Sequence, residues 1–70
     1  MSTDFLQVDA GSWLSRDGRY EVYLALEERR ARWRVWDSDE GGNVDPDDAT
    51  FRTRAEATLW LLESYAPTHP

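Results

Sequence analysis

An Asp-Gly pair between two apolar segments constrains this chain more than any other feature. Asp17 and Gly18 follow the segment 13–15 and precede the segment 20–26, in which apolar and polar positions alternate. Asp-Gly between such segments is a strong signal for a tight β-hairpin. Side chains alternate between the two faces of a strand. We therefore expect one face of the second strand to line the core, and its members are Tyr20, Val22, Leu24 and Leu26.

A third alternating segment, residues 31–36, follows a polar connection at residues 27–30. Its alternation predicts a core-facing set and an outward-facing set. The core-facing set is Ala31, Trp33 and Val35, and the outward-facing set is Arg32, Arg34 and Trp36. Residues 12–36 are therefore predicted to form antiparallel strands. The segment 1–11 leaves two arrangements open, a fourth, N-terminal edge strand or packing over the core.

The clearest local signal is a helix start at Thr53. Thr53 and Glu56 are spaced as in a capping box, where the hydroxyl and the carboxylate satisfy backbone N–H groups of the first helical turn. We predict a helix over residues 53–65 and a short tail over residues 66–70. At about 100° per residue, the predicted core stripe is Ala55, Thr58, Leu59, Leu61, Leu62 and Tyr65. Trp60 falls nearly opposite this stripe.

These segments predict the α+β class, with a three-stranded antiparallel sheet packed by one C-terminal helix. We expect Trp33, Leu24 and Leu59 to be buried together between the sheet and the helix. We expect Trp36 and Trp60 to keep substantial exposure. A chain of 70 residues allows one domain, so residues 1–70 are predicted as a single domain in which residues 37–49 form an acidic loop.

The composition argues against catalysis, a thiolate metal site and a membrane segment. The chain has no cysteine, and its one histidine, His69, lies in the predicted tail. No carboxylate pair has a His, Ser or Lys partner placed beside it. The longest apolar run, residues 59–62, is far too short to cross a bilayer. We therefore expect a cytoplasmic protein that is not an enzyme and needs no cofactor or metal.

Charge is distributed unevenly along the chain. Fourteen acidic residues oppose eight arginines, and the formal net charge is −6. Residues 37–48 place acids at the first, third, ninth and twelfth positions of a calcium-loop pattern. Gly41 stands at the fifth position, where that pattern requires a side-chain oxygen. We therefore expect a solvated loop or an acidic interaction surface here rather than a calcium site.

Residues 51–57 and the Trp60-Leu61 pair, placed after three predicted strands, resemble the arm-DNA-binding N-terminal domain of phage-type tyrosine recombinases. The resemblance covers residues 12–65. In that family the exposed face of the sheet reads DNA. The resemblance thus implies a small DNA-binding accessory domain, and the residues that match by position are Arg32, Arg34, Trp36 and Tyr23.

In size and acidity the chain is also similar to small phage-encoded inhibitors, including anti-CRISPR proteins and other DNA mimics. Clustered carboxylates can occupy a basic groove that normally binds phosphates. Our first hypothesis is therefore a non-enzymatic protein-binding module that docks on a basic surface of a nucleic-acid-binding protein, in the host cytoplasm if it is phage-encoded. Its predicted contact residues are Asp37, Asp39, Glu40, Asp45, Asp47, Asp48, Glu56, Trp60 and Glu63. The DNA-binding domain is the alternative.

Overall fold

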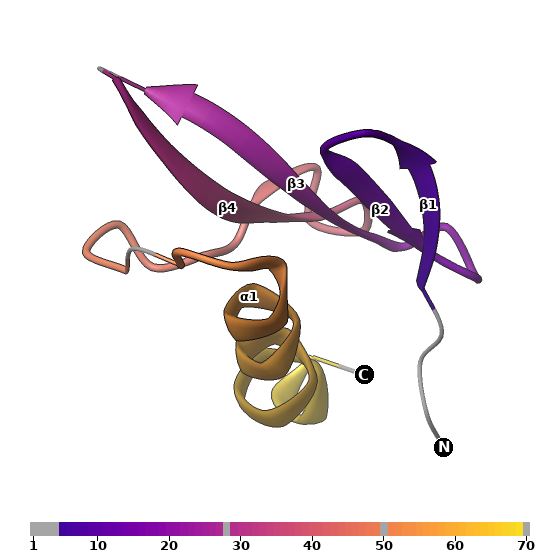
Figure 1. The fold of residues 1–70 in the computed structure, drawn as a ribbon. Coiled ribbons are helices and arrows are strands. Elements are labelled where there is room, and N and C mark those ends of the chain that lie inside the picture. Colours follow the sequence, from indigo (N-terminus) through magenta and orange to yellow (C-terminus); the bar gives the residue numbers. More distant parts are fainter. Residues whose placement is uncertain (1–4, 28, 50, 70) are drawn as a thin grey trace.

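The computed structural model describes residues 5–27, 29–49 and 51–69, which form an antiparallel sheet with one helix packed against it (Figure 1). Neighbouring strands follow chain order across the sheet. The strands are β1 (Phe5–Asp9), β2 (Ser12–Ser15), β3 (Tyr20–Glu27), β4 (Arg30–Asp37) and β5 (Gly42–Asn43). The helical part consists of α1 (Arg54–Trp60), a π-helical turn η1 (Leu61–Tyr65) and a 3₁₀ turn η2 (Ala66–Thr68).

The predicted α+β class, with an antiparallel sheet and one C-terminal helix, is confirmed, whereas the predicted number of three strands is too low. β1 is the N-terminal edge strand that the sequence left open. β5 lies inside the predicted acidic loop, and its two residues are too few for an alternating pattern to reveal. Residues 1–4 of the N-terminal segment and residue 70 of the predicted tail lie outside the described residues.

The β2–β3 turn forms at the predicted Asp-Gly pair. Gly18 has a φ of 80°, a left-handed conformation that glycine adopts without steric cost. Its N–H donates to the Ser15 carbonyl at 2.9 Å. The Asp17 carboxylate accepts from the Ser15 hydroxyl at 2.6 Å and from the Arg19 N–H at 3.0 Å. These bonds fix the register of β2 against β3.

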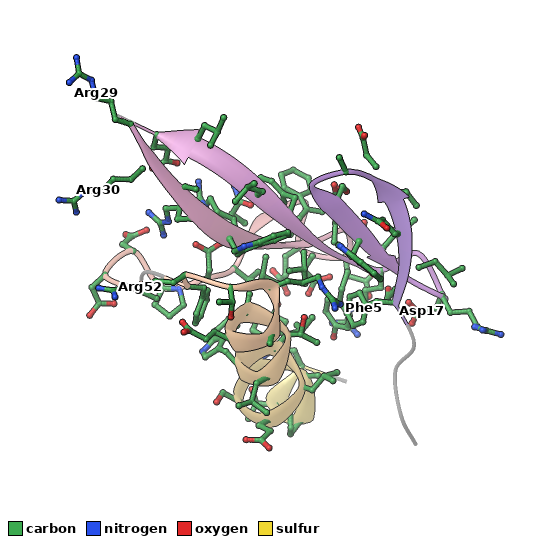
Figure 2. The ribbon with its side chains drawn as sticks, in the orientation of Figure 1. Phe5, Asp17, Arg29, Arg30 and Arg52 are labelled. Atoms are coloured by element: carbon green, nitrogen blue, oxygen red, sulfur yellow. The ribbon has the colours of Figure 1, made fainter. Side chains whose placement is uncertain are left out.

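The sheet has a front face, which α1 covers, and a back face (Figure 1). β3 and β4 continue past the helix as a two-stranded hairpin. We call the outer part of this hairpin, residues 24–27 and 29–33, the β3–β4 arm. At its tip, Arg29 and Arg30 point away from the rest of the molecule (Figure 2). The molecule is therefore thick where the helix lies and one layer thin along the arm.

Three of the four front-facing side chains of the β3–β4 arm are exposed, so the predicted burial of Leu24 is wrong. Leu24 pairs with Trp33 and Leu26 pairs with Ala31, which places all four on the front face. Leu24 is 38% exposed and Leu26 is 80% exposed, because the helix does not reach them. Trp33 is half-buried and packs against the core from its edge.

The chain that follows β4 closes the outer edge of that strand. The Val44 N–H donates to the Val35 carbonyl at 3.0 Å. The Phe51 carbonyl accepts from the Trp33 N–H at 2.8 Å. Backbone groups that would otherwise form an open strand edge are thus satisfied within the chain, and a foreign strand cannot pair there.

The helix begins where the sequence predicts. The Thr53 hydroxyl accepts from the Glu56 N–H at 3.1 Å, as in a capping box. The Glu56 carboxylate accepts from the Arg52 N–H at 3.2 Å, one residue before the N–H that the capping box uses. Helical turns then run from Arg54 to Tyr65, in agreement with the predicted range of 53–65.

The helix packs on the sheet through Leu61 and Tyr65 of the predicted stripe, together with Ala57, which that stripe did not include. Ala57, Leu61 and Tyr65 are buried, whereas Leu59 is 57% exposed. The buried residues are four apart and lie on one side of the helix, while Leu59 lies on the opposite side. The predicted burial of Leu59 is therefore wrong. The sequence allows two apolar stripes, one centred on the three leucines of residues 59–62 and one through residues 57, 61 and 65. The structure buries the second stripe.

Trp60 packs against the core, contrary to its predicted exposure. It is half-buried, and its ring lies 5.7 Å from the ring of Phe51 and 5.6 Å from that of Tyr65. Phe51 reaches this position through its bridge to β4, a contact that helical periodicity cannot reveal. The π-helical turn is closed by the Ala66 N–H and the Leu61 carbonyl, and its smaller rotation per residue keeps Tyr65 over the sheet.

The observed helix phase predicts very different losses of stability when two leucines that lie two positions apart are truncated. Leu61→Ala should lower the free energy of unfolding by about 2–5 kcal/mol, because it empties a fully buried site. Leu59→Ala should lower it by about 0.5 kcal/mol or less, because Leu59 faces solvent. Urea denaturation followed by tryptophan fluorescence measures both. A larger loss for Leu59→Ala would contradict this helix phase.

Candidate functional site

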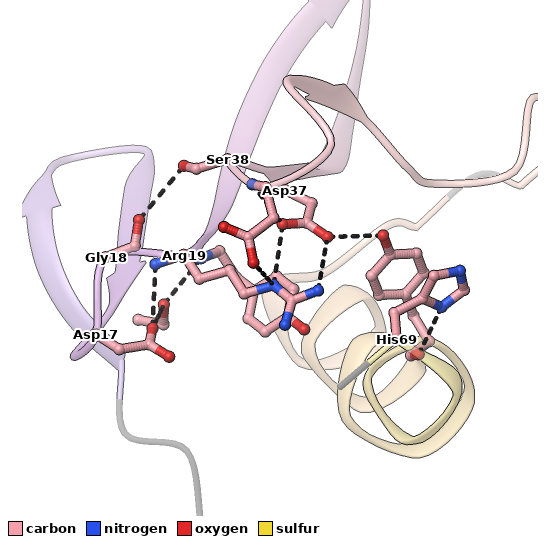
Figure 3. Close-up of polar contacts among 10 residues, drawn as sticks. Asp17, Gly18, Arg19, Asp37, Ser38 and His69 are labelled. Atoms are coloured by element: carbon pink, nitrogen blue, oxygen red, sulfur yellow. Dashed lines mark hydrogen bonds and ion pairs between the residues drawn. The ribbon is translucent and has the colours of Figure 1, made fainter.

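Asp37 at the end of β4 is fully buried and is bound by three other parts of the chain (Figure 3). Arg19 donates to its two carboxylate oxygens, from Nε at 3.1 Å and from Nη2 at 3.3 Å. The Tyr65 hydroxyl donates at 2.7 Å. The Asp39 N–H donates at 3.0 Å. One carboxylate therefore joins the β2–β3 turn, the β4–β5 turn and the end of the helix.

These contacts set the protonation state of the pair formed by Asp37 and Tyr65. Burial alone would raise the pKa of Asp37, but hydrogen bonds from Arg19 and Tyr65 outweigh it, and the pKa of Asp37 is lowered. Burial, together with the bond to Asp37, raises the pKa of Tyr65. Near neutral pH, Asp37 is therefore a carboxylate, and Tyr65 keeps the proton that it donates.

A second buried carboxylate, Asp45, is held on the outer edge of β4. It accepts from Arg32 Nη2 at 3.1 Å and from Arg34 Nε at 3.2 Å. Its other oxygen accepts from the Val35 N–H at 3.2 Å. Glu27 lies 3.8 Å from both guanidinium groups. The charges of the two central arginines of β4 are thus neutralised within the chain.

Two of the nine predicted partner-binding residues, Asp37 and Asp45, therefore lie inside the molecule rather than on a solvated loop. Trp60 is half-buried. The remaining predicted residues are exposed, and they are Asp39, Glu40, Asp47, Asp48, Glu56 and Glu63. The first and ninth positions of the calcium-loop pattern are occupied by the two buried, arginine-bound carboxylates. Within the described ranges, no group of three or more His, Cys, Asp or Glu residues could hold a metal ion.

The exposed acids of the predicted loop form two pairs along the chain, each following a carboxylate that is buried in or against β4. Asp39 and Glu40 follow Ser38, whose N–H donates to the Arg19 carbonyl beside the β2–β3 turn. Asp47 and Asp48 follow Asp45, which is held on β4 by Arg32, Arg34 and the Val35 N–H.

The residues of the predicted DNA-reading face also have partners within the chain. Arg32 and Arg34 bind Asp45, as described above. The Tyr23 hydroxyl donates to Asn43 Oδ1 at 2.6 Å. Trp36 lies on the back face and is half-buried, like Trp60, rather than substantially exposed as predicted. The structure brings these four residues together on the back face, but the two cations among them are already paired.

The front of the β3–β4 arm is the feature that sequence reasoning missed. It combines the exposed Leu24 and Leu26 with Arg29 and Arg30 at the tip (Figure 2). Among the residues that the structure describes, neither guanidinium has an ion-pair partner. Strand length is the signal that could have revealed it. Eight residues of β3 span about 26 Å, and one helix about 10–12 Å wide cannot cover them.

Neutralising Asp45 should destabilise the fold strongly. Asp45→Asn leaves Arg32 and Arg34 beside an uncharged amide, and we expect a loss of about 3–5 kcal/mol in the free energy of unfolding. The matched control is Asp47→Asn, which changes an exposed carboxylate and should cost about 0.5 kcal/mol or less. Urea denaturation at neutral pH measures both losses. Equal losses would show that the ion pairs of Asp45 contribute no more to stability than the exposed carboxylate of Asp47 does.

Removing the Tyr65 hydroxyl should make the protein more sensitive to acid. Asp37 has a lowered pKa in the folded state, so its stabilisation is present above the unfolded value of about 3.9 and is lost as the pH falls through the folded value. Tyr65→Phe removes a bond to the charged form and raises that pKa. We expect a loss of about 1.5–3 kcal/mol at neutral pH and acid unfolding at a higher pH.

The control for this measurement is Tyr23→Phe, which removes an exposed hydroxyl bonded to Asn43. Circular dichroism follows acid unfolding, and NMR titration follows the Asp37 carboxyl carbon. The assignment fails if both variants unfold at the same pH as the parent chain.

The comparisons with known proteins found no match for this chain. No helix within residues 5–27, 29–49 and 51–69 is long and apolar enough to cross a membrane. No family model matches the chain, and no curated protein and no solved structure matches it either. Neither the recombinase resemblance nor the likeness to phage-encoded inhibitors gains support from these comparisons.

Proposed function

We propose that this chain is a non-enzymatic protein-binding module that docks through the front of its β3–β4 arm. The observation that carries the proposal is the 80% exposure of Leu26, next to the exposed Leu24 and Ala31 and the half-buried Trp33. Adjacent apolar side chains that remain in solvent are typical of interaction sites. Covering Leu26 alone would contribute about 1.5–3 kcal/mol.

The tip of the arm adds a polar rim to this apolar surface. Arg29 and Arg30 point away from the body and have no acidic partner among the described residues. Arginine is enriched at protein interfaces, where its planar head binds carboxylates in a defined geometry. The partner that fits this surface has an apolar patch bordered by carboxylates.

The backbone at the tip is consistent with a functional constraint. Arg29 has a φ of 71°, in the left-handed region that glycine or asparagine normally occupies in a tight hairpin turn. An arginine there costs about 1–2 kcal/mol relative to a relaxed conformation. No ion pair between its guanidinium and another described residue offsets this conformational cost. An arginine at such a position supports a role in binding.

The exposed carboxylates support a second candidate, the inhibitor that docks on a basic protein surface. Asp39, Glu40, Asp47 and Asp48 remain in solvent, and the chain keeps its net charge of −6. Such a charge steers association with a basic partner. The arm is the better-supported surface, because exposed carboxylates provide steering but little apolar area.

Site-specific photo-crosslinking in cells distinguishes these surfaces. We expect a photo-reactive phenylalanine analogue at Leu26 to give a discrete crosslinked protein band. The same analogue at Leu6, which is 54% exposed on the back face, should give none. Placing it at Asp47 tests the second candidate. Crosslinks at Asp47 without any at Leu26 would replace the first proposal with the second, and none at either position would contradict both.

A further inference from the structure

We propose that the partner of the arm is a second copy of this chain, and that the arm of each copy docks on the outer face of the other copy's helix. This inference rests on the proposed function, since it names the occupant of the same surface. It is argued from the shape of the molecule and from a second exposed surface that complements the arm in both polarity and charge.

The second surface lies on the side of the helix that faces away from the sheet. Leu59 is 57% exposed there. Glu56 and Glu63 are also exposed, three residues before it and four residues after it, so they flank Leu59 on the same side of the helix. We call these three residues the outer helix stripe. It is an apolar side chain bordered by carboxylates, which is the chemistry that the arm requires.

The shape of the molecule allows both contacts to form at once. The helix packs against the inner parts of β3 and β4, and its Arg54 guanidinium lies 3.8 Å from the centre of the Trp13 ring, whereas the helix does not reach Leu24 and Leu26. The front of the molecule is therefore a step about one helix diameter, roughly 10 Å, in height. When two copies are related by a twofold axis, the helix of each copy fits into the space in front of the other copy's arm. Each helix then lies against the other copy's arm.

Such a twofold arrangement closes the assembly at two chains. Leu24 and Leu26 of one copy would cover Leu59 of the other. Arg29 and Arg30 would come within reach of the two glutamates that border it. Four guanidinium groups in the dimer would thereby gain carboxylate partners that they lack among the described residues of the single chain.

The contact is small, so the dimer should be weak and reversible. It would bury less than the roughly 1,200 Å² of a standard stable interface. Two chains of net charge −6 also repel one another. Dimerisation should therefore strengthen with rising salt if the apolar contact dominates, and weaken if the arginine–glutamate pairs dominate.

Sedimentation equilibrium of the purified full chain, from micromolar to millimolar concentration, tests the proposal. We expect a reversible monomer–dimer equilibrium. Leu26→Ser should weaken it by about tenfold or more, because the residue would be covered only in the dimer. The matched control is Leu6→Ser, an equally drastic change at an exposed leucine of the back face, and it should leave the dimer constant unchanged.

Charge exchange tests the pairing of the two surfaces directly. The double variant R29E/R30E and the variant E63R should each associate less with themselves than the parent chain does. A mixture of the two should recover association, because opposite charges meet again between the copies. Circular dichroism confirms that each variant keeps its fold.

Two results would overturn the inference. One is a parent chain that remains monomeric at every concentration, and the other is a dimer that Leu6→Ser weakens and Leu26→Ser does not. A monomeric chain that still crosslinks a different protein through position 26 would leave the proposed function standing and remove only the second copy as its partner.

Discussion

The burial of the Asp37 carboxylate is the constraint on which the rest of this structure depends. An isolated carboxylate inside so small a protein would be costly, so its four hydrogen bonds have to form together with the fold. Arg19 is supplied by one turn and Tyr65 by the end of the helix. The helix is thereby attached to the sheet at its far end by a polar contact, in addition to the apolar packing of Leu61.

The features that the sequence predicted correctly are those determined by neighbouring residues. The Asp17-Gly18 turn, the alternation of β3 and β4, and the Thr53 cap each follow from contacts within a few positions along the chain. Such contacts depend on local backbone preferences, so a single sequence reveals them. The same reasoning gives the α+β class, since one amphipathic helix and one hairpin sheet have few ways to bury their apolar faces.

The features that could not be predicted depend on contacts between distant parts of the chain. The helix phase involves Phe51, which bridges to β4 and packs against Trp60 with tilted rings. The predicted acidic site counted every carboxylate of the loop as exposed. In the structure Asp37 is paired with Arg19, and Asp45 is paired with Arg32 and Arg34, which the same reasoning assigned to a DNA-reading face. Composition gives the net charge of a chain, but the fold decides which charges reach solvent.

The chain-order arrangement of the five strands also bears on how fast this protein folds. Each strand pairs with the strand that precedes it, so every closure within the sheet spans a short loop and has a low entropic cost. The hydrogen bond from Tyr65 to Asp37 spans 28 residues, so its closure has a higher entropic cost than those of the strand turns. The sheet can therefore assemble first, as a thin template with an exposed apolar front. Docking of the helix then completes the native fold and covers most of that apolar front. The arm is the part of the front that stays uncovered in the native state.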